Sequence, residues 1–223
     1  MDSSGKDQGL FIAIQRGDRP GIEKLIGLDP ALVESRDEND LSVVLVALYY
    51  NHPEIASMLV ERGAHLDIFE GSAMGDLQRV RQLVDAQPGL ANAVTKDGFQ
   101  PLGLAAFFGH LDVALFLLQM GAEVNSPSDN GLHVMPLHSA AANRQLEIAR
   151  LLLEHGAMVN ATQADDFTPL HAAAQNGQLE MVKLFLDYAA DVWAASSGGQ
   201  TPLDLALQSK NEDVILLLQT QLE

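Results

Sequence analysis

The chain has 223 residues, no cysteine, and thirty acidic against thirteen basic side chains, which gives a formal net charge of −17. This charge repels the phosphate backbone of nucleic acids, and the lack of cysteine excludes disulfides, thiolate metal sites and cysteine nucleophiles. Hydrophobic residues make up 47% of the chain but aromatic residues only 5%, a balance that favours closely packed helices built from Leu, Ala, Val and Ile.

The N-terminal segment predicts neither a secretory signal nor a membrane anchor. Its apolar run from Leu10 to Ile14 is short and has no basic region before it. No stretch of the chain approaches the roughly eighteen apolar residues that are needed to cross a bilayer. We therefore expect a cytoplasmic protein that does not bind membranes.

From Gly9 onward the chain consists of a repeating unit, which is the sequence signature of a solenoid. In the C-terminal half, proline recurs at spacings of 35, 33 and 33 residues, at Pro101, Pro136, Pro169 and Pro202. Carrying this register backward adds three units, which start at Gly9, Val43 and Asp67. The predicted single domain, 1–223, therefore divides into repeats at about 9–40, 41–66, 67–97, 98–130, 131–165, 166–198 and 199–223.

Two repeats depart from the regular length. The third is about nine residues short, because it lacks the turn segment, or finger, that should precede its first helix. The segment NSPSDNGLHVM, at the boundary between the fourth and fifth repeats, carries two extra residues that lengthen one finger. Irregular loops of this kind often carry binding specificity.

Each unit is predicted to be a pair of helices with its own start and stop signals. Thr168 is an N-cap residue for the first helix, and Pro169 suits the first helical position. Gly177 can take the left-handed conformation that ends the helix. The second helix then shows the apolar spacing of an amphipathic helix. One such unit cannot bury its apolar face alone, so the units must stack.

These segments resemble the ankyrin repeat, whose pattern is TPLHxAAxxGH followed by an apolar LL run and GADVNA. Good matches are MPLHSAAANRQLEIARLLLEHGAMVN and TPLHAAAQNGQLEMVKLFLDYAADVW. The resemblance implies an all-α solenoid of about seven helix-turn-helix repeats with short β-hairpin-like fingers. Arg144 and Lys210 depart from it, because they replace the glycine that ends the first helix.

No motif in the sequence predicts catalysis, a metal or a cofactor. There is no HExxH, GxGxxG, P-loop or GxSxG pattern. The resemblance gives His138 and His171 a structural role, in which each bonds the backbone of a neighbouring loop. The acidic segment ESRDEND, from Glu34 to Asp40, is predicted to be a solvated turn, with a calcium site as the weaker alternative. We therefore expect no enzyme activity.

The resemblance also implies a binding surface, because the variable positions before TPLH and near the end of the first helix line a concave face. Six of the eleven Phe and Tyr residues fall at such positions. Aromatic side chains on an exposed face are typical of interfaces. The predicted partner-binding residues are Leu41, Tyr49, Tyr50, Met74, Phe99, Phe107, Phe108, Val134, Asn143, Phe167, Gln175 and Asn176.

The prediction for function is a protein-protein interaction module, such as a scaffold. The acidic charge either steers a basic protein partner toward this surface or serves solubility alone. The chain is expected to be a monomer. Two alternatives stay open: one aromatic of each Tyr-Tyr or Phe-Phe pair packs against a neighbouring helix, or the chain acts as a structural accessory that self-associates through its ends.

Overall fold

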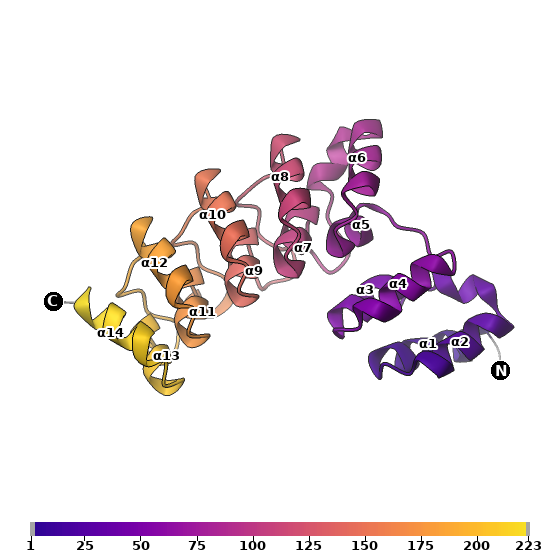
Figure 1. The fold of residues 1–223 in the computed structure, drawn as a ribbon, viewed down its shortest axis with the longest axis horizontal. Helices are drawn as coiled ribbons and strands as arrows, with labels where there is room; N and C mark the ends of the chain where they lie inside the picture. The colour runs from indigo at the N-terminus through magenta and orange to yellow at the C-terminus, as the bar shows by residue number, and fades with distance from the viewer. Residues whose placement is uncertain (1–2, 222–223) are drawn as a thin grey trace.

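The computed structural model describes residues 3–221, with side chains from residue 7 onward. Within this range it contains fourteen α-helices, three short 3-10 helices and no β-strand (Figure 1). The helices form seven consecutive pairs, and each pair stacks on the next in a two-layered array. The predicted all-α solenoid is therefore confirmed.

One layer is formed by the odd-numbered helices, which we call the inner helices, and the other by the even-numbered outer helices. The inner helices are α1 (Ser3–Gln15), α3 (Val43–Tyr49), α5 (Ile68–Met74), α7 (Pro101–Phe108), α9 (Pro136–Ala142), α11 (Pro169–Gln175) and α13 (Pro202–Gln208). The outer helices are α2 (Arg19–Leu28), α4 (Pro53–Glu61), α6 (Leu77–Ala86), α8 (Leu111–Gln119), α10 (Leu146–Glu154), α12 (Leu179–Asp187) and α14 (Glu212–Thr220). The loops contain η1 (Pro30–Glu34), η2 (Pro88–Asn92) and η3 (Ala164–Asp166).

The inner helices begin and end where local chemistry predicts. Helix α13 has Thr201 as its N-cap, whose hydroxyl accepts from the backbone N–H of Asp204. Helix α7 ends at Phe108, and the next residue, Gly109, caps it with a φ of 87°. Arg144 and Lys210 take the same left-handed turn with φ values of 61° and 58°, although each carries a Cβ. Each of these residues costs about 1–2 kcal/mol relative to a right-handed conformation.

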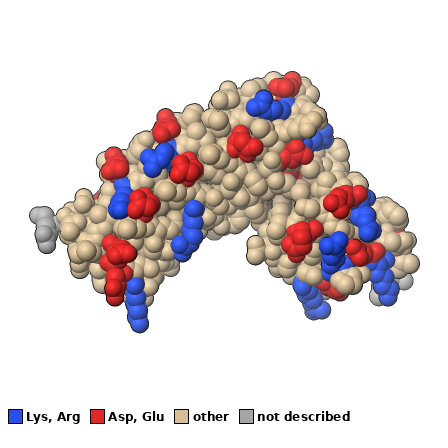
Figure 2. Space-filling view, in the orientation of Figure 1, with Lys and Arg blue, Asp and Glu red and all other residues tan. Residues whose placement is uncertain are grey.

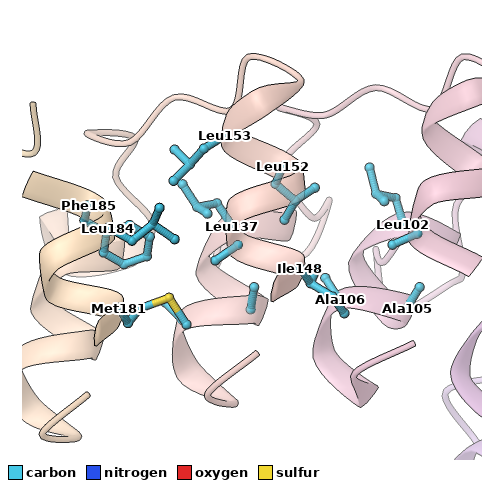
Figure 3. Close-up of a cluster of buried hydrophobic side chains, with 14 of the residues drawn as sticks. Leu102, Ala105, Ala106, Leu137, Ile148, Leu152, Leu153, Met181, Leu184 and Phe185 are labelled. Atoms are coloured by element: carbon cyan, nitrogen blue, oxygen red, sulfur yellow. The ribbon is translucent and has the colours of Figure 1, made fainter. Parts of the chain in front are cut away.

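Small alanines let the inner helices approach one another closely. Ala106, Ala141 and Ala174 hold the same register position in α7, α9 and α11, and all three are fully buried. The larger side chains of the outer helices, such as Leu152 and Phe185, fill the space between successive pairs (Figure 3). The result is one continuous apolar core from Ile68 to Leu218.

Two rows of side-chain hydrogen bonds connect many of the successive pairs. On the turn side, the side chain that follows each inner turn reaches back to the previous inner helix: His52 Nε2 to Gln15 O (3.4 Å), His110 Nε2 to Ala73 O (2.9 Å), Gln178 Nε2 to Ala141 O (2.7 Å) and Asn211 Nδ2 to Ala174 O (3.1 Å). On the finger side, asparagines bridge the outer turns: Asn92 to Gly121, Asn125 to Gly156 and Asn160 to Ala189. Backbone carbonyls at the turns are thereby satisfied by side chains of a neighbouring pair.

Both rows are interrupted between the second and third pairs. Asp76 occupies the position of His110 in the third pair, but a carboxylate cannot donate to a carbonyl, and it caps α6 through the N–H of Arg79 at 2.9 Å instead. Only residues 62–67 connect α4 to α5, so the third pair has no finger. The short third repeat that the sequence predicts is thus visible as a missing loop.

The array bends at this interruption, which we call the elbow. Helices α1–α4 turn away from the direction that α5–α14 share (Figure 1). They also have their own core, from Leu10 to Leu66. A small buried cluster of Leu45, Ala73 and Leu104 joins this core to the larger one. The molecule therefore consists of two separately packed stacks that meet at the elbow.

Candidate functional site

Three of the predicted aromatic residues meet at the elbow. The ring of Tyr49 in α3 lies 6.4 Å from that of Phe107 and 5.8 Å from that of Phe108, both in α7. The Phe107 and Phe108 rings pack edge to face at 4.9 Å. Aromatic pairs of this geometry contribute about 0.5–1.5 kcal/mol beyond the area they bury. Helix α3 thus contacts α7 even though α5 lies between them in the array.

A small residue on α5 makes this contact possible. Ala73 holds the register position of Tyr49 and Phe107, and its side chain is fully buried. The partly buried rings of Tyr49 and Phe108 pack against the cluster that contains Ala73. A large residue at Ala73 would hold these rings apart. The elbow is therefore closed by aromatic side chains from the second and fourth pairs.

The hydroxyl of Tyr49 adds a polar contact to the same junction. It lies 3.4 Å from Asp97 Oδ2, in the finger of the fourth pair. Burial, followed by the negative charge of Asp97, raises the pKa of Tyr49 above its ordinary value. Tyr49 is consequently a neutral hydrogen-bond donor at physiological pH. On the same side, Lys96 Nζ donates to Glu38 O at 3.3 Å and links the fingers of the second and fourth pairs.

Two aromatic residues of the elbow remain open to solvent. Tyr50 is 50% exposed and Phe107 is 37% exposed. Tyr49 and Phe108 are only partly exposed, so they match the alternative in which one aromatic of each pair packs against a neighbouring helix. Figure 2 shows a hollow between α1–α4 and the rest of the molecule, with few charged side chains on its walls in this view.

The other predicted residues divide between the elbow and the later pairs. Leu41 and Phe99 are half-buried and pack against the elbow cluster, and Met74 is half-buried at the end of α5. Farther along, the Phe167 ring stacks on His171 at 4.8 Å, and Val134 is half-buried in its finger. Asn143 and Asn176 bond nearby carbonyls through their side chains, and Gln175 is exposed.

Sequence reasoning missed a buried charged group beside the elbow. Glu70 in α5 is fully buried, and its Oε2 accepts from the backbone N–H of Asp67 at 3.0 Å. Its Oε1 has no hydrogen-bond partner within the described part of the chain and lies 3.7 Å from Arg36. Burial, then the hydrogen bond and charge of Asp67, raise the pKa of Glu70 to about 7. The repeat register could have predicted this burial, because Glu70 holds the position that the buried Val46 and Leu104 hold in α3 and α7.

Pockets lie on both sides of the elbow cluster. On the finger side, Arg36, Leu41, Phe69 and Lys96 help line a pocket of about 200 Å³ where the third finger is missing. On the turn side, a pocket of about 300 Å³ lies among residues of the second, third and fourth pairs. Both pockets lie where the regular stacking of the array is interrupted.

The two histidines that the sequence singled out have structural partners. His138 Nε2 donates to Ala161 O and His171 Nε2 to Gln200 O, both at 3.0 Å, as the resemblance implies. Burial lowers the pKa of His138 to about 4 and also lowers that of His171, so both rings are neutral. Within residues 3–221, no three His, Asp or Glu side chains are grouped so that they could hold a metal ion. None of the described helices is long and apolar enough to cross a membrane.

Comparison with known proteins identifies the repeat. A model for ankyrin repeats in three copies matches residues 10–128, 70–163 and 137–222. Alpha-latrocrustotoxin-Lt1a of Latrodectus tredecimguttatus is 29% identical over 124 residues, which are 52% of this chain and 9% of the toxin. Ankyrin repeat and SAM domain-containing protein 6 of Mus musculus and of Rattus norvegicus is 39% identical over 59 residues, which are 26% of this chain and 7% of each relative.

This chain therefore spans less than a tenth of the length of these curated relatives. Ankyrin repeats generally mediate protein-protein interactions and are typically non-enzymatic. The family model covers nearly all of the seven helix pairs. By sequence match and by fold, the chain belongs to the ankyrin repeat family.

Proposed function

We propose that this chain is a non-catalytic binding module that holds a protein partner against its inner-helix face, with the elbow as the main contact. The observation that carries the proposal is the exposure of Tyr50 and Phe107 at the elbow, where the Phe107 ring packs against Tyr49 and Phe108. Rigid aromatic side chains bury large areas at a low cost in conformational entropy. The remaining predicted residues, from Val134 to Asn176, extend this face along the later pairs.

The elbow is suited to binding because its rings are already ordered. Phe107 is held against Phe108 and Tyr49, so little side-chain freedom is lost when a partner covers it. Residues of this type, near the centre of an interface, are the usual hot spots. The net charge of −17 favours a partner with a basic surface. Because one chain supplies the whole elbow, we propose that it binds as a monomer.

Replacing Tyr50 and Phe107 together by Ala is expected to weaken partner binding about tenfold or more, since each substitution removes exposed aromatic area from the elbow. The measurement is capture and crosslinking from native lysate, followed by an affinity titration with the captured protein. A matched control replaces Leu132 and Trp193, which are 51% and 64% exposed and lie outside the elbow. Equal affinities for both double variants would rule out the elbow as the main contact.

A further inference from the structure

The turn-side pocket of the elbow has a definite structural origin. At the regular junctions, the side chain after each inner turn packs on the turn of the previous pair. His110 leaves no room for a Cβ at Gly75, and His52 does the same at Gly17. At the third pair this side chain is Asp76, which caps α6 and does not reach back. The turn at Asn51 is consequently left uncovered.

The vacated space is the pocket of about 300 Å³. Its wall is mainly apolar, with Leu48, Pro53, Ala73, Met74 and Phe108, and its polar members are Asn51, Ser57 and His110. Phe108 also packs edge to face against Phe107, so the pocket adjoins the exposed aromatic surface. A volume of this size is at the lower end of the range for ligand pockets, and it suits one large side chain rather than a whole loop.

The helices that line the pocket carry a few acidic residues but no Lys or Arg. Helices α3, α4, α5, α7 and α8 contain no Lys or Arg. Their acids include Glu54, Glu61 and Asp112, which are all exposed. Along the row of inner turns, the basic residues Arg16 and Arg144 stand one pair away from Tyr50 and Phe108 on either side. A segment that enters the pocket therefore meets exposed acidic side chains on α4 and α8, and no Lys or Arg on the helices that line the pocket.

We propose that the turn-side pocket receives one large apolar side chain from a partner segment that carries lysine or arginine next to that side chain. The proposal rests on the proposed function and assigns the chemistry of the partner at the same elbow. The apolar side chain replaces water in a wall made of Leu48, Met74 and Phe108. The neighbouring cation faces Glu54 and Asp112, which favours this segment over an acidic one.

The test uses the full chain labelled at its methionine methyl groups, because Met74 lines the pocket and Met158 lies far from it and is 50% exposed. The probes are synthetic peptides with a central Phe, Leu, Met or Trp flanked by lysines. Two kinds of control peptide are used. One has the same central residue flanked by glutamates, and the other has a central Ala flanked by lysines. We expect saturable shifts of the Met74 signal, with the Met158 signal unchanged, only for the lysine-flanked apolar peptides.

Charge-reversal variants supply the second part of the test. Glu54→Lys is expected to weaken binding of the lysine-flanked peptide about threefold, as reversing one exposed charge does. Glu147→Lys makes the same change at the matching position of α10 and is expected to leave binding unchanged. Both residues are exposed, so neither variant disturbs the core. An unchanged Met74 signal, or equal shifts with glutamate-flanked or Ala-centred peptides, would overturn the proposal.

The two proposals fail in distinguishable ways. If no peptide shifts Met74 while the Tyr50 and Phe107 variant still loses its protein partner, the pocket assignment is wrong and the proposed function stands. If the lysine-flanked peptides shift Met74 while partner capture is indifferent to Tyr50 and Phe107, the pocket assignment stands and the aromatic surface is not the main contact.

Discussion

Replacing Leu59 by Ala is expected to unfold the first two helix pairs while the other five stay folded. Leu59 is fully buried in the core of α1–α4. Deleting a buried leucine side chain to alanine costs about 2–5 kcal/mol. In a solenoid, each unit is stabilised only by its neighbours, and the two stacks share a small buried cluster and a few side-chain contacts at the elbow instead of a continuous core. The loss is therefore expected to stay within residues 7–66.

Hydrogen exchange measured along the chain checks this expectation. Amides of α2 and α4 should lose protection in Leu59→Ala, whereas those of α8, α10 and α12 should keep it. The matched control is Leu117→Ala, at the same register position of α8 and also fully buried. This variant should lower protection in both stacks, since two repeats alone are too few to stay folded. Uniform loss of protection in Leu59→Ala would show that the elbow does not separate the stacks.

Replacing Glu70 by Gln is expected to remove a pH dependence of stability near neutrality. The pKa of Glu70 is about 7 in the folded chain, against an ordinary value of 4.5. A raised pKa in the folded state means that stability from this group is complete below the ordinary pKa and is lost as pH rises through about 7. Gln keeps the acceptor for the N–H of Asp67 and can donate to the Asp67 carboxylate, as the protonated acid does.

The measurement is the free energy of unfolding from denaturant titrations at about pH 5.5 and 8.5. Relative to Glu70→Gln, the unsubstituted chain should be about 2 kcal/mol more stable at the lower pH than at the higher one, by proton linkage. Asp67 does not affect this comparison, because its pKa is lowered from 3.8 and the carboxyl stays ionised over the tested pH range. Glu147→Gln, at an exposed site, is the control. If the difference in free energy of unfolding between the unsubstituted chain and Glu70→Gln were the same at both pH values, Glu70 would be shown to stay ionised.

The repeat could be predicted from local signals alone. Each helix start and stop depends on residues close to it in the sequence, such as the capping residues, the prolines and the glycines that end the inner helices. Arg144 and Lys210 form the same turn without glycine. The spacing of the repeats predicted the missing third finger. It did not predict the bend of the array, because the bend depends on how the second and fourth pairs meet across α5.

The site could be predicted only in part for the same reason. Tyr50 and Phe107 are exposed, but the packing of Tyr49 on Phe108 depends on the small size of Ala73 in another repeat. The turn-side pocket depends on Asp76 capping α6 instead of reaching back. In both cases a single residue in one repeat changes the contacts made by the repeats on either side.

The most direct test of binding at the elbow is hydrogen exchange of the chain with and without its captured protein partner. Slower exchange is predicted in the segments around Tyr50, Gly75 and Gly109, where the partner covers the inner turns. The finger that contains Trp193 should exchange at the same rate in both states. Protection confined to the outer helices α10 and α12, with none at the three inner turns, would contradict binding at the elbow.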